Sequence, residues 1–210
     1  MTKIDTDILI IGGGVAGSAA AYALSNSGYQ VTLIEKSEKP QDTARGDHLQ
    51  PAVCEILDNW NLLDDFFLNG AKKRAGSLWF DEDANFLMDA NVSNLEIPQP
   101  YFMYMNHEDI SGVFIRAAEK NEGFTYLCPI LSSTHIDTNE KESIFEIKLR
   151  DGEIKKLYSK MVIIADGVAS NMGRYFNFNR TSFRYERALA VLFSEEYEAD
   201  EHNNLRTYLT

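Results

Sequence analysis

The sequence predicts an α/β fold with a parallel sheet and an inserted antiparallel portion. Three observations carry this prediction. An apolar run enters a glycine-rich turn and an alanine-rich segment within the first 26 residues, which is typical of a buried strand followed by a helix. Aromatic and β-branched residues gather in short bursts over residues 77–105, as in antiparallel strands. A late apolar run, Lys160–Ala165, predicts a further buried strand.

The opening elements follow from their periodicity. Residues 6–11 read TDILII, a short run rich in isoleucine that is typical of a parallel strand. A helix is expected over residues 15–26, with Gly28 as its C-terminal cap. A second strand follows over residues 30–34. Residues 36–48 are polar and turn-prone, so they are expected to form a loop.

Two short helices come next. Pro51 suits the first turn of a helix, where its missing N–H group is not needed. Four apolar residues then fall on one face at helical spacing: Val53, Ile56, Leu57 and Trp60. Residues 62–68 are expected to form another helix, closed by Gly70.

The rest of the chain alternates between one helix and several strands. A helix is expected over residues 108–121, ending near Gly123. Asp151-Gly152 between alternating apolar residues predicts a hairpin turn. The expected strands are 124–127, 130–134, 144–149, 154–158 and 160–165, and residues 181–210 are β-like.

Composition excludes several classes of function. The net charge of −12 argues against a non-specific nucleic-acid surface and disfavours anionic lipid. No apolar run is long enough to predict a transmembrane segment. Cys54 and Cys128 are distant in sequence, with no C-x-x-C, which favours reduced thiols and a cytoplasmic location. No spacing of ligand residues predicts a metal site.

The glycine-rich turn predicts a ligand. Gly12, Gly14 and Gly17 form a G-x-G-x-x-G between a strand and a helix, and the next strand ends on Glu35. In this layout the helix N-terminus binds a pyrophosphate and the acid binds adenosine ribose hydroxyls. The pattern therefore predicts the ADP half of a dinucleotide site. The alternative is a plain glycine-rich turn with a solvated glutamate.

Two further motifs narrow the class. Arg45-Gly46-Asp47 begins a segment that leads into the helix at Pro51, and Asp166-Gly167 ends the late buried strand. With the opening motif, they resemble the FAD-dependent monooxygenases of the para-hydroxybenzoate hydroxylase type, above all the ubiquinone-biosynthesis and aromatic-hydroxylase-like members. The resemblance covers essentially the whole chain and implies a Rossmann-like FAD/NAD(P)-binding fold.

The resemblance implies FAD as cofactor and NAD(P)H as reductant. The three glycines would line the pyrophosphate, Glu35 would hold the ribose, and Arg45 would reach toward the flavin. Asp166 and Gly167 would serve FAD and NAD(P)H, although a plain turn there is the alternative. The residues implied to bind cofactor are Gly12, Gly14, Val15, Ala16, Gly17, Glu35, Lys36, Arg45, His107, Asp166 and Gly167. No catalytic residue is assigned.

The chain departs from the family pattern in three places. His107 stands at the start of the mid-chain helix, where the family often has Arg or Gln; a histidine without a cofactor role is the alternative. Gly173 occupies the family's arginine position after the Asp-Gly, and Arg174 follows it. The family's later Gly-Asp motif is expected beyond Thr210, so a fragment, or completion by another chain, is expected.

The resemblance also implies a division into domains. Residues 1–76 and 106–180 are expected to form the FAD-binding domain. Residues 77–105 and 181–210 are expected to form part of a substrate-binding β domain.

The implied function is hydroxylation of a small aromatic, or isoprenoid-like, substrate through a flavin hydroperoxide, with NAD(P)H and O₂. Two alternatives stay open on the same fold. One is a flavin halogenase, for which Lys72 and Lys73 are the residues to inspect, or a geranylgeranyl-reductase-like enzyme. The other is a truncated, non-catalytic nucleotide-binding module. The expected partner is a second copy of the chain or a completing chain.

Overall fold

The computed structural model describes residues 2–38, 46–167, 170, 172–176, 178, 181, 183 and 205–208. Within these residues the helices are α1 (Val15–Asn26), α2 (Pro51–Asn59), α3 (Leu63–Leu68), α4 (His107–Ala118) and α5 (Met172–Tyr175). The strands are β1 (Thr2–Ile11), β2 (Val31–Ile34), β3 (Gly46–Leu49), β4 (Lys72–Arg74), β5 (Gly76–Phe80), β6 (Phe86–Asn91), β7 (Phe102–Asn106), β8 (Phe124–Leu127), β9 (Ile130–Thr138), β10 (Ser143–Leu149), β11 (Ile154–Ile164) and β12 (Leu205–Tyr208).

The chain divides into two compact units. The first unit is Met1–Asp42 with Ile110–Leu189, and the second is Thr43–Asp109 with Ala190–Thr210. The sequence prediction assigns residues 43–76 to the cofactor domain, whereas here they lie in the second unit. The reason is strand pairing, because β3 and β4 both pair with β7. The roles assigned to the two domains stay a prediction.

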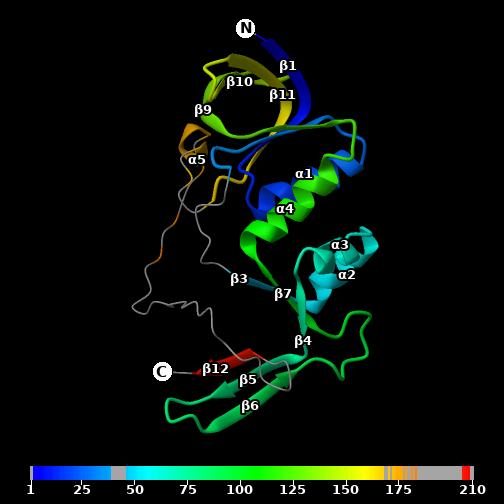
Figure 1. Cartoon of the computed structure of the whole chain (residues 1–210). Coiled ribbons are helices and arrows are strands. Elements are labelled where there is room, and N and C mark those ends of the chain that lie inside the picture. Colours follow the sequence, from blue (N-terminus) through cyan, green and yellow to red (C-terminus); the bar gives the residue numbers. More distant parts are fainter. Residues whose placement is uncertain are drawn as a thin grey trace. The chain divides into compact units, whose positions relative to one another are not determined.

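The first unit is built on a six-stranded sheet in the order β8-β2-β1-β11-β10-β9. Strands β8, β2, β1 and β11 run parallel, and β10 and β9 then continue the sheet as an antiparallel meander. Strand β1, with its glycine turn, therefore lies in the interior of the sheet between β2 and β11. Figure 1 shows β1 beside β11.

Alternation along β1 divides the core of the first unit into two layers. Ile8 and Ile10 pack with Ala21, Val31 and Leu33 on the face covered by α1. Helix α4 lies beside α1 (Figure 1), where the rings of Tyr22 and Phe114 are 6.4 Å apart. On the other face, Leu9 and Ile11 pack with residues of β10, β11 and α5: Phe145, Ile147, Leu157 and Met172.

The second unit contains two three-stranded sheets. One has the order β3-β7-β4 and is antiparallel throughout. The other has the order β12-β5-β6, in which β5 and β6 are antiparallel and β12 runs parallel to β5. Helices α2 and α3 bury Leu57 and Phe66, while Met103 of β7 is also fully buried. The predicted α/β class with inserted antiparallel strands is confirmed.

Some local predictions are wrong in instructive ways. The predicted loop over residues 36–48 ends in strand β3 (Gly46–Leu49), because β7 supplies a pairing partner from far along the chain. Strand β4 was not expected, since Lys72–Arg74 is a charged run with no apolar alternation. The predicted apolar face of α2 is also wrong in part: Cys54 and Leu57 are buried, whereas Ile56 is 47% exposed.

The predicted strands 154–158 and 160–165 are a single strand, β11. Its first half pairs with both β10 and β1, and its second half follows β1 to Ile11. The strand continues through Ser159 and Lys160, although the register of β1 and β11 pairs no residue with Lys160 and the Ser159 hydroxyl accepts the N–H of Leu9. Of the β-like segment 181–210, the structure describes the strand β12 and residues 181 and 183; the remainder lies outside the described residues.

Candidate functional site

The turn after β1 is shaped by close backbone contacts. Gly12 has φ +109°, a conformation that side chains disfavour, and a Cβ there would collide with the carbonyl oxygen of Ala165. A Cβ on Gly17 would collide with the carbonyl oxygen of Gly12. These two glycines therefore let the turn lie against the end of β11 and let α1 begin directly over the turn.

Gly14 differs from its two neighbours in the motif. A Cβ built on it meets no atom of the described residues within 4 Å, so its absence is not needed for packing. Gly14 is the N-cap of α1, and no side chain caps the helix there. The amide N–H groups of the first turn, which include Val15 and Ala16, have no partner within the helix by geometry. The result is an open cradle with the partial positive charge that attracts phosphate.

Glu35 lies beside this cradle, at the end of β2. Its Oε2 accepts a hydrogen bond from the N–H of Gly13 at 2.6 Å, and its Oε1 accepts one from Ser37 at 2.9 Å. Its own backbone is bound to the neighbouring segment, by N–H donation to Leu127 and acceptance from Ile130. The carboxylate is thus held in one orientation at the edge of the turn, while the next residue, Lys36, is exposed.

The end of β11 completes the described part of the site. The N–H of Ala165 donates to Ile11 at 2.8 Å, which aligns the ends of β11 and β1. Asp166 Oδ2 accepts a hydrogen bond from the N–H of Met172 at 3.4 Å. Gly167 has φ +77°, and its carbonyl accepts from Ser170. The chain therefore turns sharply at Asp166-Gly167, next to the glycine turn.

The structure thus brings together the glycine turn, Glu35 and Asp166-Gly167, all in the first unit. Arg45 lies outside the described residues, as do Val168 and Ala169. His107 is the first residue of α4, as predicted, and is half-buried in the second unit. Sequence reasoning missed Gly13 and Ser37, whose N–H groups bind Glu35. A backbone donor leaves no mark on residue type, so no sequence signal could have identified them.

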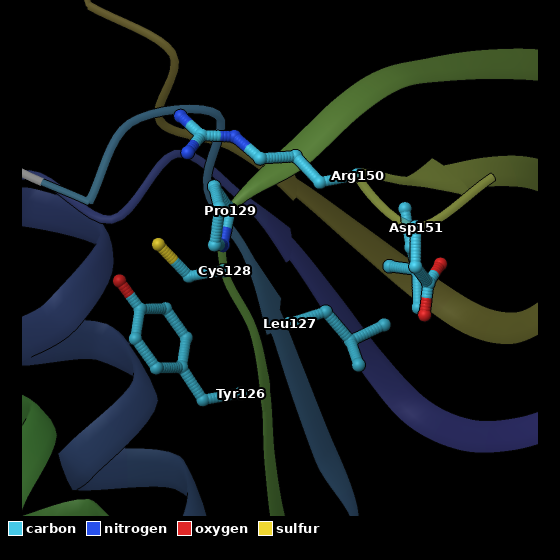
Figure 2. A pocket seen from close by; sticks show the side chains of 7 residues that line it. Tyr126, Leu127, Cys128, Pro129, Arg150 and Asp151 are labelled. Atoms are coloured by element: carbon cyan, nitrogen blue, oxygen red, sulfur yellow. The ribbon is translucent and has the colours of Figure 1, made fainter. Parts of the chain in front are cut away.

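A hollow of about 300 Å³ borders the Glu35 segment. Its lining comes from the end of β8 and the β10–β11 turn: Tyr126, Leu127, Cys128, Pro129, Leu149, Arg150 and Asp151. Figure 2 shows Arg150 extending over Pro129 and the hydroxyl of Tyr126 pointing toward the sulfur of Cys128. Burial raises the pKa of both the Tyr126 hydroxyl and the Cys128 thiol, and a Tyr126–Cys128 hydrogen bond raises that of Tyr126 further.

Two contacts join the hollow to the chain after Glu35. The Cys128 thiol donates to the carbonyl oxygen of Ser37 at 3.4 Å. Arg150 forms an ion pair with Glu38 at 3.3 Å, although both side chains are more than half exposed, so this pair adds little stability. Two residues that line the hollow, Cys128 and Arg150, therefore contact the segment directly after Glu35, the candidate for ribose binding.

Within the described ranges, no group of three or more His, Cys, Asp or Glu residues is arranged to hold a metal ion. In that part of the chain, moreover, no helix combines the length and apolar character needed to cross a membrane.

A dinucleotide fits these residues. The pyrophosphate requires close backbone approach and free N–H groups, which Gly14 and the start of α1 offer. The ribose requires an oriented acceptor, which Glu35 offers. The pyrophosphate of FAD would therefore bind at Gly14 and the start of α1, and its adenosine ribose at Glu35.

Comparison with known proteins agrees with the geometry. Residues 5–209 match the FAD binding domain family. Squalene monooxygenase SE1 of Panax ginseng is 28% identical over 80% of this chain and 31% of its own length. A tryptophan 2-halogenase of Chondromyces crocatus is 26% identical over 81% of this chain and 32% of its own. The 3-demethoxyubiquinol 3-hydroxylase of Escherichia coli is 26% identical over 95% of this chain and 51% of its own.

The chain thus spans between about a third and a half of the length of these relatives. Among solved structures, p-nitrophenol 4-monooxygenase of Pseudomonas putida superposes with a TM-score of 0.73 at 20% identity, over 82% of this chain and 43% of that one. At that identity the likeness shows the fold. The match over residues 5–209 shows the family: the chain belongs to the FAD-binding domain family of FAD-dependent monooxygenases.

Proposed function

We propose that this chain supplies the ADP-binding half of an FAD site in a monooxygenase that hydroxylates a small aromatic or similar electron-rich substrate with NAD(P)H and O₂. The observation that carries the proposal is the open cradle at Gly14, over an uncapped helix start and beside the fixed carboxylate of Glu35. A squalene monooxygenase and a 3-demethoxyubiquinol 3-hydroxylase among the relatives support the reaction class.

The residues of this chain bind and orient the cofactor. The N–H groups at the start of α1 would hold the pyrophosphate oxygens, because they are unpaired within the helix and carry the positive end of its dipole. Glu35 would accept hydrogen bonds from the ribose hydroxyls, and its negative charge would repel a 2′-phosphate at the same place. When bound, the flavin supplies the redox chemistry. Arg45, His107 and Lys36 remain predicted contacts.

The direct test is titration of the purified chain with FAD, followed by quenching of flavin fluorescence. We expect saturable binding with one FAD per chain. The variant Gly14→Val places side-chain atoms in the cradle, where a Cβ meets no described residue within 4 Å, so it should fold normally and weaken FAD binding about 100-fold. Ser27→Ala, at the exposed far end of α1, is the matched control and should bind as the native chain does.

Two outcomes would overturn the proposal. One is a folded native chain that neither contains flavin nor binds added FAD. The other is a Gly14→Val variant that binds FAD with native affinity. Oxidation of NAD(P)H in the presence of candidate phenols then tests the reaction, in the longer protein if the chain has a continuation.

A halogenase is the second candidate, because one relative is a tryptophan 2-halogenase. Of the two lysines to inspect for this reaction, Lys72 and Lys73, the second packs against aromatic rings. The ammonium of Lys73 lies over the rings of Tyr101 and Phe67, at 4.1 and 5.0 Å from their centroids. Formation of a chlorinated product that depends on chloride, and its loss in Lys73→Met, would favour the halogenase; hydroxylated product at any chloride concentration would exclude it.

The third candidate is a non-catalytic nucleotide-binding module. Native mass, measured together with FAD stoichiometry, separates it from a homodimer or a complex with a completing chain. We also propose a cytoplasmic location, which the two free thiols Cys54 and Cys128 support.

A further inference from the structure

The segment after Asp166-Gly167 returns to the core through a short helix. The N–H of Met172, the first residue of α5, donates to the Asp166 carboxylate. Met172 is itself buried, with 6% of its surface exposed, in the core layer formed by β1, β10 and β11. The side chain of Asp166 is therefore tied to α5, and α5 is tied to the sheet.

An aromatic cluster provides the second attachment of α5. Phe176, directly after the helix, lies with its ring centroid 5.0 Å from His135 of β9 and 6.5 Å from Phe145 of β10. The ring of His135 also meets that of Phe145 edge-on at 5.3 Å. Phe145 is fully buried, so the cluster is anchored in the core rather than on the surface.

Hydrogen bonds hold His135 in this orientation. Its Nε2 lies 2.7 Å from the hydroxyl oxygen of Thr138, which in turn lies 3.0 Å from the hydroxyl oxygen of Ser143. This chain of side chains spans β9 and β10. The imidazole therefore joins the β9–β10 meander, on one side, to Phe176 on the other.

We propose that His135 and Phe176 are positioning residues for the nucleotide site, because they fix α5 and, through Met172, the Asp166 carboxylate. Asp166 must hold its place closely, since the backbone of Ala165 and Asp166 lies so near the glycine turn that a Cβ on Gly12 would collide with it. A shift of α5 would thus be transmitted to the glycine turn. The proposal rests on the proposed function only where it concerns FAD. The coupling between α5 and the glycine turn through Asp166 exists in the protein without FAD.

The test combines hydrogen exchange of the ligand-free chain with FAD titration, in Phe176→Ala and His135→Ala. Three amides report on the coupling, each with a known acceptor: Ala165, Ser170 and Met172. We expect Phe176→Ala to speed their exchange about tenfold while the α1 amides stay protected, and to weaken FAD binding about tenfold. Ile136→Ala, which removes an exposed side chain next to His135, is the control and should change neither.

His135→Phe separates ring packing from hydrogen bonding. It keeps an aromatic ring against Phe176 but loses the bond to Thr138, so an effect between those of native and His135→Ala is expected. If Phe176→Ala does not fold, Phe176→Leu, which keeps apolar volume but not the ring, should show the same pattern at smaller amplitude.

The outcomes are distinguishable. If the native chain binds no FAD but the variants exchange the three amides faster, the proposed function is refuted and the coupling stands. The positioning role would be refuted by a different result, in which the native chain binds FAD normally. In that result the folded Phe176 and His135 variants keep either native FAD affinity or native amide exchange. A general rise in exchange that includes α1 would show that the cluster contributes to global stability alone, which also refutes it.

Discussion

Strand β11 begins after one Asp-Gly pair and ends at another, and the two pairs behave differently. In both, the glycine adopts positive φ: +89° at Gly152 and +77° at Gly167. Asp151 accepts a hydrogen bond from Glu153 of its own turn, whereas Asp166 accepts one from Met172 of the following helix. The first pair joins antiparallel neighbours. The second ends beside parallel β1 and its glycine turn. The neighbouring strand, rather than the dipeptide itself, therefore makes the second pair the candidate site.

The largest effect expected from this comparison is at Gly12, which touches the second pair. Gly12→Ala combines positive φ with a collision against Ala165, so it should lower the free energy of unfolding by at least about 3 kcal/mol. Gly152→Ala has positive φ but open space around its Cβ, and should cost about 1 kcal/mol. Urea denaturation measures both. Equal losses would show that contact with β11 carries no special constraint.

The next effect concerns ligand binding by the two aspartates. Asp166→Ala removes both the negative charge and the acceptor for α5, and should weaken FAD binding about tenfold. Asp166→Asn keeps an acceptor and should recover part of the affinity. Asp151→Ala is the matched control at the other end of the strand. A similar loss of FAD affinity in both alanine variants would contradict the distinction drawn between the two pairs.

Thiol labelling examines whether the first pair borders the nucleotide site. Cys54 is fully buried, and burial raises its pKa to about 11, so it should not react until the chain unfolds. Cys128 is partly exposed in the hollow that Asp151 helps to line (Figure 2), and should react slowly at about pH 8.

Bound FAD should slow this labelling about twofold to threefold, because Cys128 donates to Ser37 beside Glu35. Mass spectrometry locates the adduct, and Cys128→Ser supplies the blank. An unchanged rate would mean that the β10–β11 turn takes no part in the site.

The smallest effect lies midway along β11. Lys160 donates to Asp7 at 2.6 Å, and this hydrogen bond, with a further one from the N–H of Gln30, lowers the pKa of the Asp7 carboxyl below 3.8. A carboxyl whose pKa is lowered by folding stabilises the fold at pH values above its unfolded-state pKa. This stabilisation is lost as the pH falls through its folded-state pKa. Native and Asp7→Asn chains should therefore differ slightly in melting temperature at neutral pH, and the difference should begin to shrink below about pH 4 and vanish only below the folded-state pKa of Asp7. A constant difference across this range would exclude the carboxylate as its source.

The elements that the sequence predicted correctly are those whose signals lie within their own residues. Helix α1 was predicted to the residue because its glycine turn, alanine content and Gly28 are all local signals. Strands β3 and β4 were not, since their partner β7 lies some 30 to 55 residues away and nothing in their own composition indicates pairing. The continuity of β11 through Ser159 and Lys160 was missed for the same reason: β1 lines both sides of that polar step.

The candidate site follows the same rule. From the order of amino acids alone came the glycine turn, the acid after β2 and the Asp-Gly after a buried strand, because each depends on residue types at fixed spacing. Tertiary structure alone identified the backbone atoms of Ala165 and Gly12 that the absence of a Cβ at Gly12 and Gly17 accommodates, and the open space at Gly14. It alone supplied the Gly13 and Ser37 donors for Glu35 and the His135–Phe176 cluster behind Asp166. These depend on contacts between distant segments, which no spacing along the chain encodes.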